Sequence, residues 1–166
     1  LYNNLKSEMV YPATELEDMS GGIISVLAIH SNGTSNISST GSSNSSWNGT
    51  CQIFMKEVSG TTISDFTGTD GATIVYNGPI SLVNGVMTIE LSTPYIYGGG
   101  NLLVGYYYTT GGSYGNVTWK GESVSNAAVY GRSDNSYSVN AASFLPKTTF
   151  TYEPSSGVAF PATFEA

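Results

Sequence analysis

The stretch that decides the fold is Thr93-Pro94-Tyr95-Ile96-Tyr97-Gly98-Gly99-Gly100-Asn101-Leu102-Leu103-Val104-Gly105-Tyr106-Tyr107-Tyr108. Pro94 cannot donate a ladder hydrogen bond and consecutive glycines can turn the backbone sharply, so this stretch predicts a corner before residue 101. Residues 102–108 are apolar, aromatic or glycine, which indicates a central strand covered on both faces. Strand alternation separates two faces. We expect the core face to hold Leu102, Val104 and Tyr106, and the opposite face to hold Leu103, Gly105 and Tyr107.

The chain carries few charges. Charged residues make up 10% of the sequence, far below the roughly 25% of an average globular domain. Gly, Ser, Thr, Asn and Tyr supply the polarity instead, which favours an extracellular or cell-surface location. The formal net charge is −7 and the Lys and Arg residues are scattered singly, so no nucleic-acid surface is expected. No apolar run approaches the ~18 residues that span a bilayer, so membrane insertion is not expected.

The length of 166 residues fits one sandwich domain. All-β sandwiches of this size are often undivided and can bury one sizeable core. We expect a single module at residues 1–152, followed by a linker or edge strand at 153–166. No signal peptide precedes Leu1, so we expect this chain to be part of a longer polypeptide that contains other domains. Cys51 is the only cysteine, which leaves no intrachain disulfide and favours a small core residue.

Short strands separated by turn residues fill the rest of the chain, without a sustained helical period. We expect an edge strand around residues 8–11 and a single helical turn within 11–19. Residues 31–50 are almost all Ser, Thr, Asn or Gly and predict a mobile surface loop, and Asn77-Gly78-Pro79 predicts a turn. The further expected strands are 22–30, 50–58, 73–76, 86–91, 116–120, 127–131 and 144–152. This pattern predicts an all-β fold, a two-sheet antiparallel jelly-roll-like β-sandwich.

Four parts of the chain carry a family resemblance. They are Lys6-Ser7-Glu8-Met9-Val10-Tyr11-Pro12-Ala13, Phe54-Met55-Lys56-Glu57-Val58, Thr93-Pro94-Tyr95-Ile96-Tyr97 with Gly99-Gly100-Asn101-Leu102-Leu103-Val104-Gly105, and Leu145-Pro146-Lys147-Thr148-Thr149-Phe150. Over about residues 5–152 the chain resembles a repeated surface module of Bacteroidetes, similar to cleaved-adhesin jelly rolls of the gingipain type and to galactose-binding-like domains. The resemblance implies a secreted or cell-surface β-sandwich that acts in adhesion or glycan recognition, and it implies no catalytic residue. Such modules commonly hold structural calcium in acidic loops.

Two groups of acids are candidates for calcium binding or for glycosidase chemistry. Asp65 and Asp70 could offer oxygen ligands, but they lack the dense acidic spacing of a calcium loop, and we favour turn capping. No metal or other cofactor is therefore expected. A glycosidase pair needs two acids that face one cleft. Glu15, Glu17 and Asp18 cluster on a polar turn instead, which favours a solvated acidic patch.

One motif is a candidate for nucleophilic catalysis. Gly111-Gly112-Ser113-Tyr114-Gly115 matches the nucleophile-elbow pattern, which requires a strand before the serine and a helix after it. A strand-like segment follows instead, and the single histidine, His30, lies far upstream. We therefore expect a glycine-rich hairpin turn and no enzyme activity.

Aromatic side chains give the positive functional signal. Sugars stack apolar C–H faces on flat rings and need neighbouring polar groups for hydrogen bonds. If Trp119 is exposed rather than in the core, its indole beside Tyr107 and Tyr114 forms a predicted sugar platform. The candidate ligand-binding residues are Trp119, Tyr107, Tyr114, Asn101, Asn116 and Asp70. The predicted function is a non-catalytic module that binds a glycan or a host surface protein, and the alternative is a structural spacer domain without a small ligand.

Overall fold

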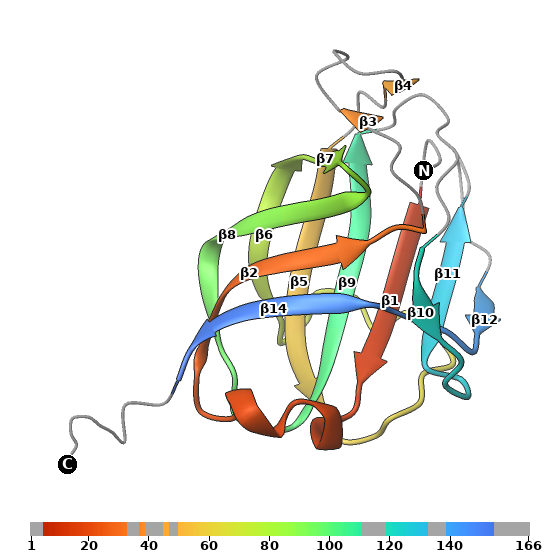
Figure 1. Ribbon diagram of the computed structural model, residues 1–166. Coiled ribbons are helices and arrows are strands. Elements are labelled where there is room, and N and C mark those ends of the chain that lie inside the picture. The colour runs from red at the N-terminus through yellow and green to blue at the C-terminus, as the bar shows by residue number, and fades with distance from the viewer. Residues whose placement is uncertain are drawn as a thin grey trace.

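Two six-stranded sheets form the fold in the computed structural model, which describes residues 5–32, 37–38, 45–46, 50–110, 119–132 and 139–154 (Figure 1). The first sheet, in spatial order, consists of β12 (Asn140–Ala142), β11 (Ala128–Arg132), β1 (Leu5–Tyr11), β9 (Asn101–Thr110), β5 (Thr50–Val58) and β6 (Thr73–Pro79). The second consists of β14 (Thr148–Glu153), β2 (Ile23–His30), β8 (Val86–Ile96), β7 (Ser81–Val83), β3 (Ile37–Ser38) and β4 (Ser45–Ser46). Among these pairs, only β3 and β4 run parallel.

Two smaller pieces complete the described fold. A two-stranded ribbon joins β10 (Gly121–Glu122) to β13 (Leu145–Pro146). After β1 the chain forms two short 3₁₀ turns, η1 (Ala13–Glu15) and η2 (Glu17–Met19), where the sequence predicted a single helical turn. Within the described residues, no helix is long and apolar enough to cross a membrane.

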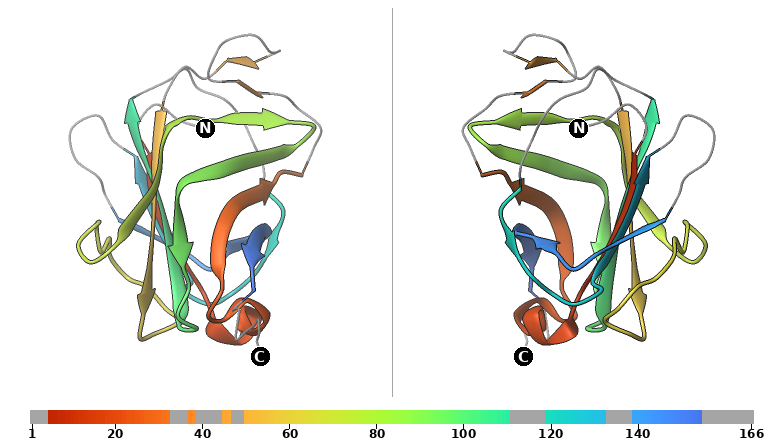
Figure 2. Two further views of the ribbon diagram at one scale, coloured as in Figure 1. Left: turned by 90° about the vertical axis from the view of Figure 1, so that its left-hand side faces the viewer. Right: turned by 90° about the vertical axis from the view of Figure 1, so that its right-hand side faces the viewer.

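The two sheets pack face to face with their strands crossing. In Figure 1, β2, β8 and β14 run across β1, β5 and β9, and Figure 2 shows the two layers from the sides. Between the sheets lies a buried cluster, the inter-sheet core, which includes Ile24, Leu27, Ile53 and Leu102. This arrangement is the all-β, two-sheet, jelly-roll-like sandwich that the sequence predicted, with strands crossing as in orthogonal packing.

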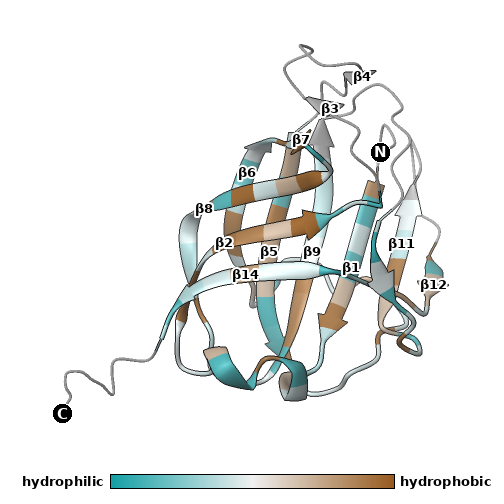
Figure 3. Ribbon diagram, in the orientation of Figure 1, coloured by the Kyte–Doolittle hydropathy of each residue, from teal (hydrophilic) through white to brown (hydrophobic). Residues whose placement is uncertain are grey.

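Strand β9 lies in the middle of the first sheet, between β1 and β5. Its alternation is as predicted. The residues in the inter-sheet core are Leu102, Val104 and Tyr106. On the opposite face lies a second cluster, the outer-face core, made of buried Val10, Phe54, Ile63, Leu103 and Val129 with partly buried Val58, Phe66, Ala72 and Tyr107. Hydrophobic segments recur along β2, β8 and β9 in Figure 3, where the sheets overlap.

The segment 59–72, which joins β5 to β6, covers the outer face of the first sheet. It places Ile63 and Phe66 against the outer-face core. The Ile63 N–H donates to the Asn126 carbonyl at 2.9 Å, which ties the segment to the chain just before β11. This cover explains why β9 is apolar on both faces.

Strand β1 is central, and the expectation of an edge strand around residues 8–11 is wrong. It pairs with β9 on one side and with β11 on the other. Glu8 is fully buried on this strand. Its carboxylate accepts hydrogen bonds from the Thr67 N–H at 2.9 Å, the Thr67 hydroxyl at 2.6 Å, the Gly68 N–H at 3.2 Å and the Tyr107 hydroxyl. Because these donors replace water, a central strand can hold a charged residue.

The predicted glycine corner joins β8 to β9. Gly99 has a φ of 100°, a conformation that side chains other than glycine rarely adopt. The Glu57 carboxylate accepts hydrogen bonds from the Gly98 N–H at 2.8 Å and the Gly100 N–H at 2.9 Å. Pro94 lies inside β8, at the point where the pairing of β8 with β2 shifts register. The proline therefore interrupts the ladder without ending the strand.

The turn predicted at Asn77-Gly78-Pro79 is wrong, because β6 continues through Pro79. Pro79 pairs with Thr50 at the end of an edge strand, where a missing N–H is tolerated. The chain passes from the first sheet to the second at Ile80, which is buried between β6 and β7. The predicted strand 144–152 is split into β13 and β14 at Lys147.

Several predictions fall outside the described residues. They include most of the loop predicted at 31–50, the motif at 111–115, and all of the predicted strand 116–120 except Trp119 and Lys120. Trp119 forms an isolated antiparallel bridge with Ser31 at the end of β2. The last described residue is Pro154, so the tail predicted at 153–166 is described only at its start.

Candidate binding groove

Trp119 and Tyr107, the two rings of the predicted sugar platform that the structure describes, pack on opposite faces of the first sheet. Trp119 is partly buried and packs against the inter-sheet core. Tyr107 packs against the outer-face core on the other side of the first sheet, edge-on to Phe54 and Phe66 at ring-centroid distances of 5.0 and 6.3 Å. Tyr114 and Asn116 lie outside the described residues. The condition for the platform, an exposed Trp119 beside Tyr107, is therefore not met.

Asn101 and Asp70 lie at positions that hold the fold together. The Asn101 side-chain carbonyl accepts a hydrogen bond from the Ala13 N–H at 2.9 Å, and its amide donates to the Ser59 carbonyl at 3.2 Å. Asp70 is exposed on the covering segment, and its backbone carbonyl accepts a hydrogen bond from the Lys56 ammonium at 3.2 Å. Neither residue lines the groove described next.

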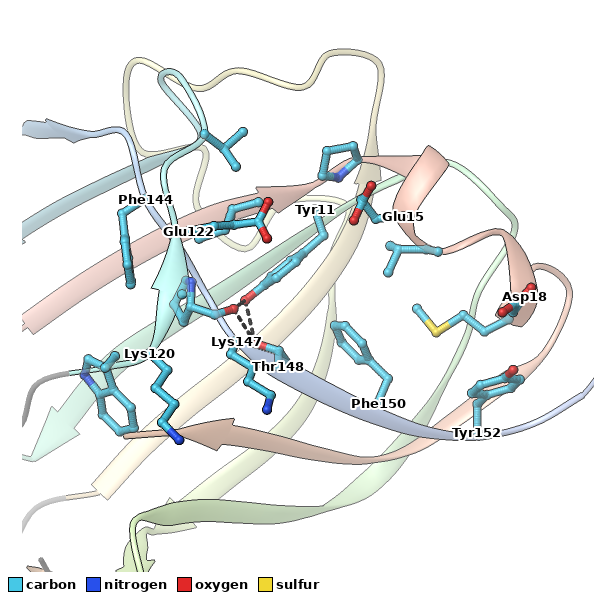
Figure 4. A pocket seen from close by; sticks show the side chains of 18 of the residues that line it. Tyr11, Glu15, Asp18, Lys120, Glu122, Phe144, Lys147, Thr148, Phe150 and Tyr152 are labelled. Carbon is cyan, nitrogen blue, oxygen red and sulfur yellow. Dashed lines mark hydrogen bonds between the residues drawn. The ribbon is translucent and has the colours of Figure 1, made fainter. Parts of the chain in front are cut away.

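An open groove of about 1060 Å³ runs beside β14, the edge strand of the second sheet. Its walls come from β14, from the β10–β13 ribbon and from the two 3₁₀ turns, as Figure 4 shows. The strand has alternating burial, which places Thr148, Phe150 and Tyr152 on the half-buried side that faces the groove. These three elements are far apart in the sequence, and the sandwich fold brings them together.

Tyr11 forms the floor of the groove. Its hydroxyl lies 2.7 Å from the Thr148 hydroxyl and donates to the Pro146 carbonyl at 3.2 Å. Its ring meets the Phe150 ring edge-on, with centroids 5.7 Å apart and an interplanar angle of 89°. Burial raises the pKa of the Tyr11 phenol well above its ordinary value, so the hydroxyl stays protonated. The floor is therefore neutral and held in one orientation.

Further rings stand along the walls. Trp119, Phe144 and Tyr152 are each partly buried and line the groove. Phe144 can lie over the ribbon because residue 121 is glycine. A Cβ there would lie 2.1 Å from the Leu145 carbonyl oxygen and 2.4 Å from the Phe144 ring, which is closer than real contacts allow.

Charged side chains of both signs line the groove, and one of them is Glu122 on the β10–β13 ribbon. In Figure 4, Lys120 and Lys147 lie at one end, whereas Glu15 and Asp18 on the 3₁₀ turns lie at the other. The backbone fixes the lysine end, because the Lys147 N–H donates to the Lys120 carbonyl at 2.7 Å. Nearby, burial and then the positive charges of both lysines lower the pKa of His30.

The arrangement is suited to holding a ligand by stacking and hydrogen bonding. It offers partly exposed rings for apolar faces, and both carboxylates and ammonium groups for directional polar contacts. No group of three or more His, Cys, Asp or Glu side chains in the described residues could hold a metal ion. Sequence reasoning found Trp119 but missed Tyr11, Phe150 and Tyr152. The alternation of Thr148, Phe150 and Tyr152 was a usable signal, since it placed two rings on one face of an edge strand.

Fold and groove together define a two-sheet β-sandwich with an aromatic-lined groove along one sheet edge. No protein-family model, no curated protein and no solved structure matches the chain.

Proposed function

We propose that this chain is a non-catalytic extracellular or cell-surface module that binds a glycan in the groove beside β14. The observation that carries the proposal is the groove itself, in which partly buried rings and charges of both signs line about 1060 Å³ of open space. The sparse charge of the chain and its resemblance to surface adhesion modules support the same function. A carbohydrate displayed by a host surface is the partner of this kind that best fits such a groove.

The physical basis is the match between the groove and the two sides of a sugar. A pyranose presents an apolar face to a ring and hydroxyls to carboxylates and amides. Tyr152 and Phe144 offer rings, while Glu15 and Asp18 offer hydrogen-bond acceptors near one end. The ammonium groups of Lys120 and Lys147 lie at the other end of the groove, and they favour a glycan that places an acidic group beside them.

The proposal is tested by titrating oligosaccharides of equal length, neutral and uronic-acid-containing, into the protein by isothermal calorimetry. Tyr152→Ala and Phe144→Ala should each weaken binding about fivefold, the contribution of roughly 1 kcal/mol per stacked ring. Lys147→Ala should weaken acidic glycans more than neutral ones. Thermal midpoints of each variant confirm that the folded state is retained.

Tyr130→Ala is the matched control, because Tyr130 is an exposed ring on β11 that does not line the groove. Its affinity for glycans should equal that of the unmodified protein. If no glycan binds, or if the Tyr152 and Phe144 variants bind as tightly as the control, the groove is not a glycan site. The spacer function, in which the module positions other domains of its polypeptide, then becomes the better account.

A further inference from the structure

Three basic residues meet where β2 ends, beside the start of β14. The backbone N–H of His30 donates to the Lys147 carbonyl at 3.2 Å, and the backbone N–H of Lys120 donates to the His30 carbonyl at 2.9 Å. The backbone N–H of Lys147 in turn donates to the Lys120 carbonyl at 2.7 Å. This closed set of hydrogen bonds fixes the three residues to one another. They come from three separate segments, so the fold and not the local sequence brings them together.

The side chains of Lys120 and Lys147 have no partner of opposite charge in the described part of the chain. By contrast, Lys56 donates to two backbone carbonyls at 2.8 and 3.2 Å, and Lys6 lies over two aromatic rings. In Figure 4 the side chains of Lys120 and Lys147 extend in the same direction, and the Glu122 carboxylate lies apart from both ammonium groups. Two like charges held near each other cost free energy, and an anion bound between them would remove that cost.

His30 contributes a third donor next to the two lysines. Its Nε2 lies 2.9 Å from the hydroxyl of Thr149, on the exposed side of β14. Burial, and then the positive charges of Lys147 and Lys120, lower the pKa of the imidazole. The imidazole is therefore largely neutral at pH 7 and gains its proton only in more acidic solution.

Among the described residues, no carboxylate faces His30 from the strands on either side of β2. Its own partner on β8 is an uncharged valine. Glu90 on β8 pairs with Val26, and Glu153 on β14 pairs with Ile23, so both acids lie at least four positions along β2 from His30. The charged groups that act on the imidazole are therefore the two lysines.

We infer that His30, Lys120 and Lys147 form a binding site for a sulfate or phosphate group. Such a group presents three terminal oxygens to donors from three segments, whereas a carboxylate presents two oxygens in one plane. Hydrogen bonds between ionised partners are roughly twice as strong as neutral ones. The inference rests on the proposed function in one respect: Lys120 and Lys147 also line the groove, so the group would be an ester carried by the bound glycan. The anion site itself can be tested without a sugar.

Anion binding at this site should depend on pH. A negative group beside His30 opposes the charges of the lysines and raises the pKa of the imidazole, so binding is coupled to proton uptake. Affinity therefore rises as the pH falls through the pKa of His30 in the bound state. Sulfate keeps its double charge in this pH range, whereas phosphate does not. Sulfate should bind about tenfold more tightly at pH 5 than at pH 8.

Titration of sodium sulfate at fixed ionic strength, followed by NMR, tests the site. Because His30 is the single histidine of the sequence, its imidazole resonance reports both anion binding and its own pKa. One sulfate should bind per chain and should raise the pKa of His30 relative to chloride, and acetate should bind at least about fivefold more weakly. Glucose 6-sulfate and glucose 6-phosphate, with glucose as the neutral reference, distinguish the two kinds of ester.

Variants locate the bound anion. Lys120→Gln and Lys147→Gln should each weaken sulfate binding about tenfold, since each removes a charge-assisted hydrogen bond. His30→Gln should abolish the dependence on pH and keep the affinity at pH 8 within about twofold. Lys6→Gln is the matched control, because it removes the same charge from a lysine that lies over aromatic rings on the first sheet. It should leave sulfate affinity unchanged.

The inference is overturned if sulfate binds no more tightly than acetate, or if Lys6→Gln weakens sulfate binding as much as Lys147→Gln does. An equal pKa of His30 in sulfate and in chloride would also overturn it, and that measurement needs no variant. Tight sulfate binding without any gain from the sugar of glucose 6-sulfate would support the anion site and would count against the glycan groove instead.

Discussion

The carboxylate of Glu8 fastens the covering segment 59–72 to the first sheet. It is fully buried and accepts hydrogen bonds from Thr67, Gly68 and Tyr107. Hydrogen bonds to an ionised acceptor are roughly twice as strong as neutral ones. The same residue therefore stabilises a β-strand and the loop that shields that strand from water.

Replacing Glu8 with Gln should lower the free energy of unfolding by about 3 kcal/mol. The neutral amide weakens the charge-assisted hydrogen bonds, and its NH₂ group faces donors rather than acceptors. Urea denaturation measures the change. Glu90→Gln is the control, because Glu90 is exposed on β8, and it should leave the unfolding midpoint unchanged. Equal losses in both variants would show that the buried hydrogen bonds of Glu8 contribute nothing specific.

Gly105 is required by the ring that packs over it. It pairs with Phe54 on β5, and a Cβ at position 105 would lie 2.1 Å from the Phe54 ring. Because Phe54 is fully buried, Gly105→Ala should destabilise the protein by about 1–3 kcal/mol through overpacking. Adding Phe54→Leu should recover part of the loss. Gly60→Ala, with no atom nearer than 4.0 Å to the added carbon, should be tolerated when measured in the same urea titration.

Sequence patterns correctly predicted the burial of residues where neighbouring residues determine it. They failed where a partner distant in the sequence determines it. The two faces of β9 follow from alternation within seven residues, and they are confirmed. The burial of Glu8 depends on donors 59 and 60 residues further along the chain. The residues around Glu8 do not indicate these donors. Because the first residues of β1 are polar, the sequence predicted an edge strand.

At the scale of elements, the corner between β8 and β9 combines backbone strain with close contact. Gly99→Ala should lower the free energy of unfolding by about 1–3 kcal/mol, because φ at 100° disfavours a side chain. The added carbon would also lie 2.5 Å from the Ser20 hydroxyl. The double variant Gly99→Ala with Ser20→Gly removes that contact and should recover only part of the loss in thermal unfolding. Full recovery would show that the backbone conformation costs nothing.

Predictions of secondary-structure elements were also correct where neighbouring residues determine the structure and wrong where distant pairing determines it. The strands β2, β5 and β8 were predicted from their apolar residues, whereas Asn77-Gly78-Pro79 was read as a turn. Those turn residues lie in an edge strand, where the ladder with β5 tolerates them. The groove could not be predicted, since it exists only once β14, the β10–β13 ribbon and the 3₁₀ turns are assembled.

At the scale of the whole molecule, buried tyrosines limit stability in alkali. Burial raises the pKa values of Tyr11, Tyr106 and Tyr108 well above the ordinary value. The folded state therefore keeps phenolic protons that the unfolded state loses above about pH 10. The contribution of these tyrosines to the free energy of unfolding should be constant below that pH and should fall as the pH rises above it.

Absorbance of the phenolate band, recorded together with circular dichroism, checks this expectation. The buried tyrosines Tyr11 and Tyr106 should ionise only as the β-sheet signal is lost. Tyr106→Phe removes one raised group and should shift the alkaline transition to higher pH. Complete ionisation of the tyrosines in a folded sandwich would contradict the assignment of these side chains to the interior.

The rate at which the single thiol, Cys51, is alkylated reports how often the sandwich opens. Cys51 is 1% exposed between the sheets, so an alkylating reagent can reach it only after the sandwich opens. The labelling rate should be slower than that of the unfolded chain by the equilibrium constant for opening, tenfold for each 1.4 kcal/mol, and should rise steadily with urea. Mass spectrometry after timed exposure would measure it. A rate independent of urea would mean that the thiol is reached by a local fluctuation instead of by separation of the two sheets.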